Sequence, residues 1–224
     1  EALEVIEAVA QHLQAPTLIY GQHWHVYEER NRLVYQDERG LLDLPLPVLP
    51  GAHQIYNAGA ALAALRHLDL PETRFEAAVT RAQWPARLQR LKTGPLKDMA
   101  PDADLWLDGG HNAAAGQALA SHLAQQSLRP TYLICGMLNT KDVAGYLAPM
   151  APYVAELFAV SIPGEANTLP AETTATAAKS VGMAATAADT VNAAVAKILK
   201  SDPASRILIC GSLYLAGQIL RENA

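Results

Sequence analysis

Short apolar runs alternate with stretches of helical spacing through the second half of the chain. The runs are bounded by glycine, proline or charged residues, as is typical of buried strands. Continuous apolar strands that alternate with helices indicate a mostly parallel sheet covered on both faces. We therefore predict an α/β fold, a Rossmann-like doubly wound domain. The predicted strands are 105–107, 132–135, 157–160, 183–186 and 207–210, and the predicted helices are 112–126, 142–150, 171–181, 188–200 and 213–222.

The first part of the chain has a different pattern. Apolar residues between positions 3 and 13 are spaced for a helix that ends before Pro16. Short runs separated by charged turns predict a small antiparallel sheet, and the prolines after it favour an edge position for its last strand. Thr73 and Glu76 fit a capping box that opens a helix. The predicted strands are 17–20, 25–28, 33–36 and 41–46, and the predicted helices are 53–68 and 73–82.

This change of pattern predicts two domains, residues 1–90 and residues 91–224. The chain has no initiator methionine, and helical spacing is already present at residue 3. We therefore expect residues 1–90 to be the C-terminal remnant of a domain whose main body lies upstream.

Composition narrows the class of protein. Half of the residues are apolar and 17% are charged, so the chain can bury a substantial core. The net charge of −5 disfavours a nucleic-acid surface, and no apolar run approaches the roughly 20 residues needed to span a membrane. Residues 1–14 contain three glutamates and no lysine or arginine, unlike a signal peptide. We expect a cytoplasmic protein with two reduced core cysteines.

Three predicted strands end in glycine-containing loops, at residues 108–112, 136–142 and 211–214. In open parallel sheets, ligands bind at the carboxyl ends of the strands, and helix N-termini there favour anions. The sequence Leu-Ile-Cys-Gly occurs at the end of two of these strands, at 133–136 and 208–211. No P-loop, dinucleotide fingerprint, zinc pattern or nucleophile elbow is present in the sequence.

Residues 108–112, Asp-Gly-Gly-His-Asn, resemble the Asp-Gly-Ala-His-Asn signature of folylpolyglutamate synthases and dihydrofolate synthases. Further segments resemble motifs of this family in the same order. They are Gly-Ala-His-Gln with Asn57 and Ala58 (51–58), Trp-Pro-Ala-Arg-Leu (84–88), Gly-Met with Lys-Asp (136–142) and Cys-Gly-Ser-Leu-Tyr (210–214). Ala86 and Ala113 stand where the family usually has glycine and proline.

The resemblance implies a member of the Mur ligase superfamily, in which a P-loop ATPase domain precedes a smaller Rossmann-like domain. Residues 1–90 would end the first domain, and residues 91–224 would form the second, a glutamate-binding domain. The implied reaction joins L-glutamate to dihydropteroate or folate through an acyl phosphate. ATP and Mg²⁺ would be held mainly by the upstream P-loop domain, so this chain would be inactive alone.

The resemblance also implies individual roles. Asn57 would contact adenine, Arg87 the phosphates of ATP, and Asp108 the ribose, while His111, Ser212 and Lys141 would hold glutamate. Asp108 and His111 are the candidate catalytic residues.

All of these residues except Lys141 also have a structural interpretation. Asn57 would bond a nearby loop, Arg87 would form a surface ion pair, and Asp108 would steady a loop. His111 would bond the backbone, and Ser212 would cap a helix, as we expect Asp142 to do.

Two alternative functions remain open. Other Mur-superfamily ligases, such as those for peptidoglycan precursors, carry a similar Asp-x-x-His-Asn element. The early His-Gln pair and the final Cys-Gly-Ser-Leu-Tyr favour the folate branch. The third hypothesis is a non-catalytic module that binds a small anion at the sheet edge.

Overall fold

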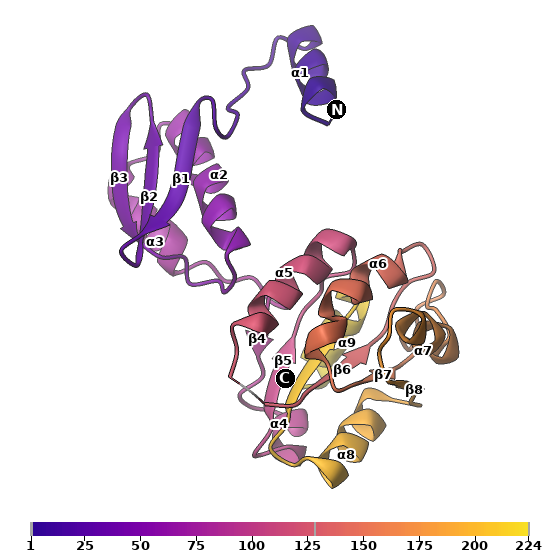
Figure 1. Ribbon diagram of the computed structural model, residues 1–224. Coiled ribbons are helices and arrows are strands. Elements are labelled where there is room, and N and C mark those ends of the chain that lie inside the picture. The colour runs from indigo at the N-terminus through magenta and orange to yellow at the C-terminus, as the bar shows by residue number, and fades with distance from the viewer. Residues whose placement is uncertain (1, 128, 224) are drawn as a thin grey trace. The chain divides into compact units, whose positions relative to one another are not determined.

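The computed structural model describes residues 2–127 and 129–223. The chain forms two compact units, Glu1–Gln83 (unit 1) and Trp84–Ala224 (unit 2), which are labelled by element in Figure 1. The break between the units precedes residue 90 because strand β4 (Gln89–Arg90) pairs with β5 (Asp104–Leu107) of unit 2.

Unit 1 is built on a small antiparallel sheet, as the sequence predicted. Its strands β1 (Trp24–Glu29), β2 (Arg32–Asp37) and β3 (Gly40–Pro45) lie in the order β1-β2-β3, so β3 is at an edge. Helices α2 (His53–His67) and α3 (Phe75–Thr80) pack on this sheet. The shared core is formed by Trp24, Leu33, Tyr35, Leu62, Phe75 and their neighbours.

Two predictions for unit 1 were wrong. Residues 17–20 do not form a strand: Tyr20 makes a single bridge to Trp24. The nearby backbone turns back instead, because the Ile19 N–H donates to the His23 side chain and the His23 N–H donates to the Ile19 carbonyl. The predicted capping box is also absent.

Thr73 lies inside a 3₁₀ turn, Glu72–Arg74, and α3 begins at Phe75 without a side-chain cap. The Glu72 carboxylate is bound to Arg66 instead. Helix α3 ends at Thr80, before the predicted end at 82.

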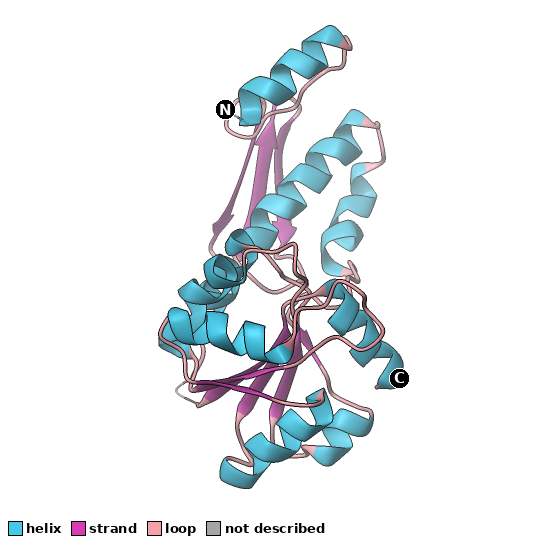
Figure 2. Ribbon diagram, turned by 90° about the vertical axis from the view of Figure 1, so that its right-hand side faces the viewer, coloured by secondary structure: helices cyan, strands magenta, loops and turns pink. Residues whose placement is uncertain are grey.

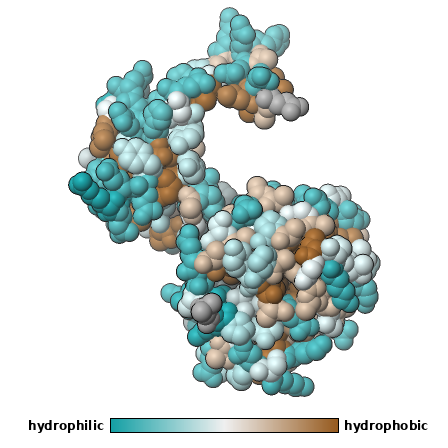
Figure 3. Space-filling view, viewed as in Figure 1, coloured by the Kyte–Doolittle hydropathy of each residue, from teal (hydrophilic) through white to brown (hydrophobic). Residues whose placement is uncertain are grey.

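Helix α1 (Ala2–His12) confirms the predicted first helix, but none of its residues is buried. Apolar side chains stay exposed on it and just after it, and Figure 3 shows brown residues along this segment. These exposed residues are Leu3, Val5, Ile6, Val9 and Leu13.

Unit 2 confirms the predicted α/β fold. In its described residues a six-stranded sheet has the order β4-β5-β9-β6-β7-β8, and only the pairing of β4 is antiparallel. The remaining strands are β6 (Thr131–Cys135), β7 (Glu156–Ala159), β8 (Ala185–Ala187) and β9 (Arg206–Cys210). The helices are α4 (Pro95–Met99), α5 (Ala113–Ala124), α6 (Val143–Leu147), α7 (Ala171–Ser180), α8 (Val191–Ser201) and α9 (Leu213–Glu222), with a 3₁₀ turn at Ala148–Tyr153.

Helices cover both faces of this sheet, as Figure 2 shows. One apolar core joins the sheet to α4, α8 and α9, and the other joins it to α5, α6 and α7. Successive residues of β9 alternate between the cores: Ile207 and Ile209 face the first, and Leu208 and Cys210 face the second. The continuous apolar runs in the sequence therefore reflect burial on both faces.

Candidate ligand site at the carboxyl edge of the sheet

The strand order brings the three glycine-containing loops together. Strand β9 lies between β5 and β6, so the loops that follow these three strands leave neighbouring strand ends. The Gly136 N–H donates to the Cys210 carbonyl (3.2 Å), which ties the ends of β6 and β9. Gly211 has a φ of +104°, and a Cβ there would lie 2.7 Å from the Gly136 carbonyl oxygen. Glycine is therefore required where these strands end.

Residues 84–88 join this edge through backbone contacts. The Gly109 N–H donates to the Ala86 carbonyl (2.9 Å), and the Leu88 N–H donates to Asp108 Oδ2 (2.9 Å). A Cβ on Gly109 would lie 2.3 Å from Leu213 Cδ2. Three of the motif segments, 84–88, 108–112 and 210–214, thus meet at one place.

The Asp108 side chain lies between the segments 84–88 and 108–112 and accepts hydrogen bonds from both. Its side chain is 6% exposed, and Oδ1 accepts a second backbone hydrogen bond from the Gly110 N–H (2.7 Å). The carboxylate therefore steadies two loops, which is the structural interpretation given above.

Arg87 lies in a strained turn. Its neighbours Ala86 and Leu88 have φ values of +57° and +44°, in the left-handed region that costs about 1–2 kcal/mol for residues with a Cβ. The Ala86 N–H donates to Gln89 Oε1 (2.9 Å), which helps to hold the turn. Arg87 is half-buried, and its side chain makes no hydrogen bond or ion pair with any residue that the structure describes. The surface ion pair considered from the sequence is therefore not found.

His111 Nδ1 lies 2.9 Å from the Gly109 carbonyl oxygen. Because a carbonyl can only accept, Nδ1 must carry the proton, which leaves Nε2 as the acceptor of the neutral ring. The side chain is half-buried. The backbone contact thus fixes the tautomer of the imidazole.

Two helix caps complete the edge. Ser212 is buried and caps α9, with Oγ accepting from the Tyr214 N–H (3.1 Å). Asn112 caps α5 by accepting from the Ala115 N–H (2.9 Å). Helix α5 thus begins at Ala113, directly after this cap and without the proline that the family resemblance implies at 113. An asparagine directly before a helical pattern could have predicted the cap. The sequence motifs include Asn112 but did not predict its capping role, and they did not indicate the contacts made by Gln89 and by the Ala86 carbonyl.

The loop after β6 is held separately. The Asn139 N–H donates to the Asn167 carbonyl and the Leu169 N–H to the Met137 carbonyl, both at 2.9 Å. Asp142 caps α6 by accepting from the Gly145 N–H (2.9 Å), as predicted. Lys141 is half-buried, and no hydrogen bond joins it to His111 in the described chain.

Asn57 belongs to unit 1, in the second turn of α2, and its side chain is exposed. Its Nδ2 donates to Gln54 Oε1 (3.0 Å), so its partner lies on its own helix rather than in a loop.

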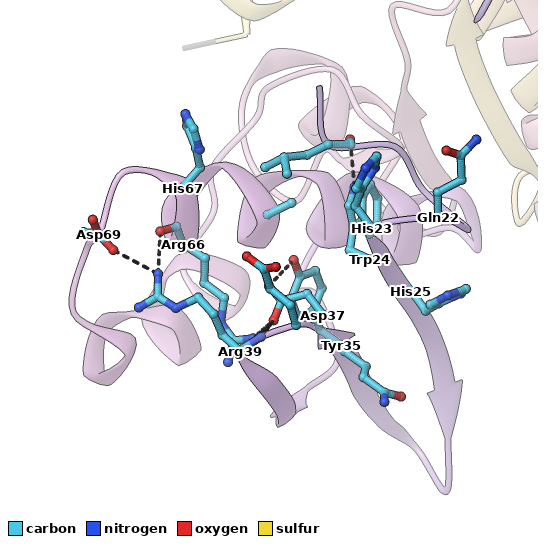
Figure 4. A pocket seen from close by; sticks show the side chains of 14 residues that line it. Gln22, His23, Trp24, His25, Tyr35, Asp37, Arg39, Arg66, His67 and Asp69 are labelled. Atoms are coloured by element: carbon cyan, nitrogen blue, oxygen red, sulfur yellow. Dashed lines mark hydrogen bonds and ion pairs between the residues drawn. The ribbon is translucent and has the colours of Figure 1, made fainter. Parts of the chain in front are cut away.

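A depression of about 740 Å³ in unit 1 has none of the predicted site residues in its lining (Figure 4). Buried Arg66 binds the Asp37 carboxylate, the Gly40 carbonyl and Glu72, and Arg39 binds Asp69. Two arginine–aspartate pairs in the lining, Arg66 with Asp37 and Arg39 with Asp69, thus bind one another, which indicates a stabilising cluster rather than a ligand site.

No group of three or more His, Cys, Asp or Glu residues that could hold a metal ion occurs among residues 2–127 and 129–223. Within the same residues, no helix combines the length and the apolar character that crossing a membrane requires.

The open, mostly parallel sheet, with glycine loops and capped helices at its carboxyl edge, defines unit 2 as an α/β domain of the doubly wound type, in which ligands generally bind at that edge. Residues 95–222 match the family model described as dihydrofolate synthetase, C-terminal domain, and the chain belongs to this family.

Similar proteins agree with this assignment. The chain is 27% identical to the folylpolyglutamate synthase of Lacticaseibacillus casei over 195 residues, 84% of this chain and 42% of that protein. The Mycobacterium tuberculosis folylpolyglutamate synthase complexed with ADP and AMPPCP superposes with a TM-score of 0.82 at 25% identity, covering 99% of this chain and 53% of that one.

A bifunctional folylpolyglutamate synthase/dihydrofolate synthase with Mn, AMPPNP and L-glutamate bound gives a TM-score of 0.80 at 25% identity, over 97% of this chain and 50% of that one. The chain thus spans about half the length of the relatives that it matches.

Proposed function

We propose that this chain is the C-terminal part of an ATP-dependent ligase that joins L-glutamate to dihydropteroate or folate. The observation that carries the proposal is the family match over residues 95–222, together with the meeting of three family motifs at one sheet edge. The proposal is supported by similar structures, which include a folylpolyglutamate synthase complexed with ADP and a bifunctional synthase with L-glutamate bound.

The proposed reaction has two steps. A carboxylate oxygen of the pterin substrate attacks the γ-phosphorus of ATP, which forms an acyl phosphate and releases ADP. The amine of glutamate then attacks the acyl carbon, phosphate leaves, and the amine loses a proton. Catalysis would rest on positioning and charge stabilisation, because no covalent nucleophile is needed.

Arg87 is the residue we assign to the phosphates. Its guanidinium has no partner in the described residues and is held in a strained turn, a feature that often marks functional sites. Arginine also binds pairs of phosphate oxygens in a fixed geometry.

We assign glutamate binding to His111, Ser212 and Lys141, and adenine contact to Asn57. His111 Nε2 is an available acceptor for the incoming ammonium group, because Nδ1 is used by the backbone. The Ser212 hydroxyl already caps α9, so this end of the helix would contribute backbone N–H groups to a carboxylate. Lys141 would supply positive charge.

The remaining parts of the proposal concern the rest of the polypeptide. We infer an upstream P-loop domain that holds ATP and Mg²⁺, and we assign no residue of this chain to the metal. The exposed apolar residues of α1 would pack on that domain, and this chain would be inactive alone. Two buried free cysteines fit a cytoplasmic location.

Glutamate-dependent release of phosphate by the full-length polypeptide, with dihydropteroate or folate as acceptor, tests this function. Arg87→Gln should lower kcat/KM by about 10²-fold, because a charge-stabilising donor is lost. Arg81→Gln is the matched control, since Arg81 is exposed in unit 1 and should leave the rate unchanged. Equal activity of both variants would remove Arg87 from the site, and turnover with a peptidoglycan precursor instead of folate would overturn the substrate assignment.

A further inference from the structure

The repeated Leu-Ile-Cys-Gly sequence places two cysteines side by side at the carboxyl ends of β6 and β9. Cys135 and Cys210 are direct partners in the register of these strands, and adjacent strands lie about 4.8 Å apart. Both side chains are fully buried in the core between the sheet and α5, α6 and α7. A hydrogen bond between the two thiols, together with burial, raises the pKa of Cys135. The two sulfur atoms are therefore neighbours.

A third sulfur atom lies at the same place. Met137 is fully buried and follows Cys135 by two residues. A Cβ on Gly211 would lie 2.8 Å from Cys135 Sγ and 2.9 Å from Met137 Sδ, so both sulfurs approach the residue directly after Cys210. Because residue 211 is glycine, no side chain from this residue separates the two sulfurs. Cys135, Met137 and Cys210 thus form a sulfur cluster beneath the loops at the carboxyl edge.

A buried hydroxyl group lies beside the sulfur cluster. Tyr146 is fully buried, and its OH makes no well-directed hydrogen bond with any residue that the structure describes. Burial and the neighbouring thiols of Cys210 and Cys135 raise the pKa of Tyr146. Buried tyrosine hydroxyls usually have a partner. The Tyr146 OH is therefore a donor available to negative charge that develops on the thiols.

The ligand types in the sulfur cluster indicate which metal ion it suits. Thiolates and thioethers are soft ligands that select Cu(I), whereas Mg²⁺ prefers oxygen ligands. Structural zinc sites and iron–sulfur clusters usually need four cysteine or histidine ligands. Within residues 2–127 and 129–223, no His, Asp, Glu or further Cys joins the two cysteines in a metal-binding group. Two thiols and one thioether match Cu(I) better than Zn²⁺ or iron.

We propose that Cys135, Cys210 and Met137 form a binding site for Cu(I) at the carboxyl edge of the sheet of unit 2. Both S–H bonds break, each sulfur forms a bond to the ion, and two protons leave to solvent without any change of oxidation state. The Tyr146 OH donates to a bound thiolate and offsets part of its buried charge. The ion joins the ends of β6 and β9, and the inference does not depend on the ligase reaction proposed above.

Competition with the chromophoric chelator bicinchoninate, on this chain without oxygen and with ascorbate as reductant, tests the site. The wild type should take one equivalent of Cu(I) from the chelator. Cys135→Ala and Cys210→Ala should each weaken binding by more than about 10²-fold, since loss of a ligand should exceed the effect of losing an outer partner. Met137→Leu and Tyr146→Phe should each weaken it by on the order of tenfold.

Met183→Leu is the matched control, because Met183 is buried in the same core but is not part of the sulfur cluster. It should bind Cu(I) as the wild type does. Leucine conserves most of the volume of methionine, so Met137→Leu remains informative even where a cysteine variant does not fold. Equal affinities of Met137→Leu, Met183→Leu and the wild type would overturn the proposed thioether ligand.

X-ray absorption at the copper edge separates this site from binding to exposed histidines. The Cu(I)-loaded wild type should show sulfur neighbours alone. Nitrogen neighbours in the first shell, or failure of the wild type to take Cu(I) from bicinchoninate, would overturn the inference. Both measurements use this chain without any ligase assay, so their outcome is independent of whether the longer polypeptide joins glutamate to folate.

Discussion

At the scale of single residues, the sequence motifs identified segments that meet at the sheet edge. They did not predict most of the contacts that these segments make there. Asp142 caps its helix as predicted, and Ser212 has the capping role given as its structural interpretation. Backbone groups make much of the site, since the Ala86 carbonyl and the Leu88 and Gly110 N–H groups set its geometry. Every residue has the same backbone groups, so the residue types in a sequence do not indicate which N–H and carbonyl groups will make these contacts.

Gly211 gives a sharp test of the packing at this edge. Gly211→Ala should reduce the free energy of unfolding of unit 2 by about 3 kcal/mol, because backbone strain adds to overpacking. A Cβ at residue 211 would lie 2.7 Å from a backbone oxygen and 2.8 Å from Cys135 Sγ.

Gly182→Ala is the matched control for urea unfolding. Gly182 has a similar φ of +87° but nothing within 4 Å of an added Cβ, so its substitution should cost only about 1 kcal/mol of strain. Equal losses in the two variants would contradict the close approach of β6 and β9.

At the scale of elements, long periodic segments were predicted well, and some of the shortest segments were not. The buried strands and the flanking helices of unit 2 follow the predicted ranges, because burial on both faces leaves a strong apolar signal. The two-residue strand β4 and the short helix α4 were missed, since so few residues carry no readable period. The predicted capping box does not form. Glu72, rather than Thr73, is bound at this turn, and its partner Arg66 lies on α2.

The buried ion pair between α2 and β2 predicts a large difference between two similar substitutions. Asp37→Asn should destabilise unit 1 by about 3 kcal/mol, because Arg66 is 4% exposed and would lose the more buried of its two carboxylate partners, keeping only the exposed Glu72. Asp43→Asn is the control, since its ion pair with Arg32 is exposed and should contribute at most about 1 kcal/mol. Urea unfolding of unit 1 that gives equal losses would contradict the buried role of Arg66.

His122 on α5 predicts a pH dependence for unit 2. Burial, followed by the nearby Arg206, lowers the pKa of His122 below its ordinary value of 6.5. The unfolded chain therefore binds the proton more readily, so stability is full above pH 6.5 and falls as the pH drops toward the lowered pKa. His122→Gln should flatten this part of the curve of unfolding free energy against pH, and an unchanged slope would show that another group is responsible.

At the scale of the whole molecule, the sequence predicted the α/β fold of unit 2 and the antiparallel sheet of unit 1. The placement of β9 between β5 and β6 was not predicted, because a pattern of apolar residues indicates where strands occur along the chain but not their order in the sheet. That order is what brings the motif loops to one edge. The chain spans about half the length of its relatives, and we propose that the complete reaction is carried out by a longer polypeptide.

The most direct test of the proposed ligase reaction traces the carboxylate oxygens of the substrate during turnover by the full-length polypeptide. Dihydropteroate labelled with ¹⁸O in its carboxylate would be incubated with ATP, Mg²⁺ and L-glutamate, and the products analysed by mass spectrometry. An acyl phosphate predicts one ¹⁸O in the released phosphate and one in the new glutamyl amide. Phosphate without ¹⁸O, or no glutamyl product at all, would contradict the assignment of this chain to a glutamate ligase that works through an acyl phosphate.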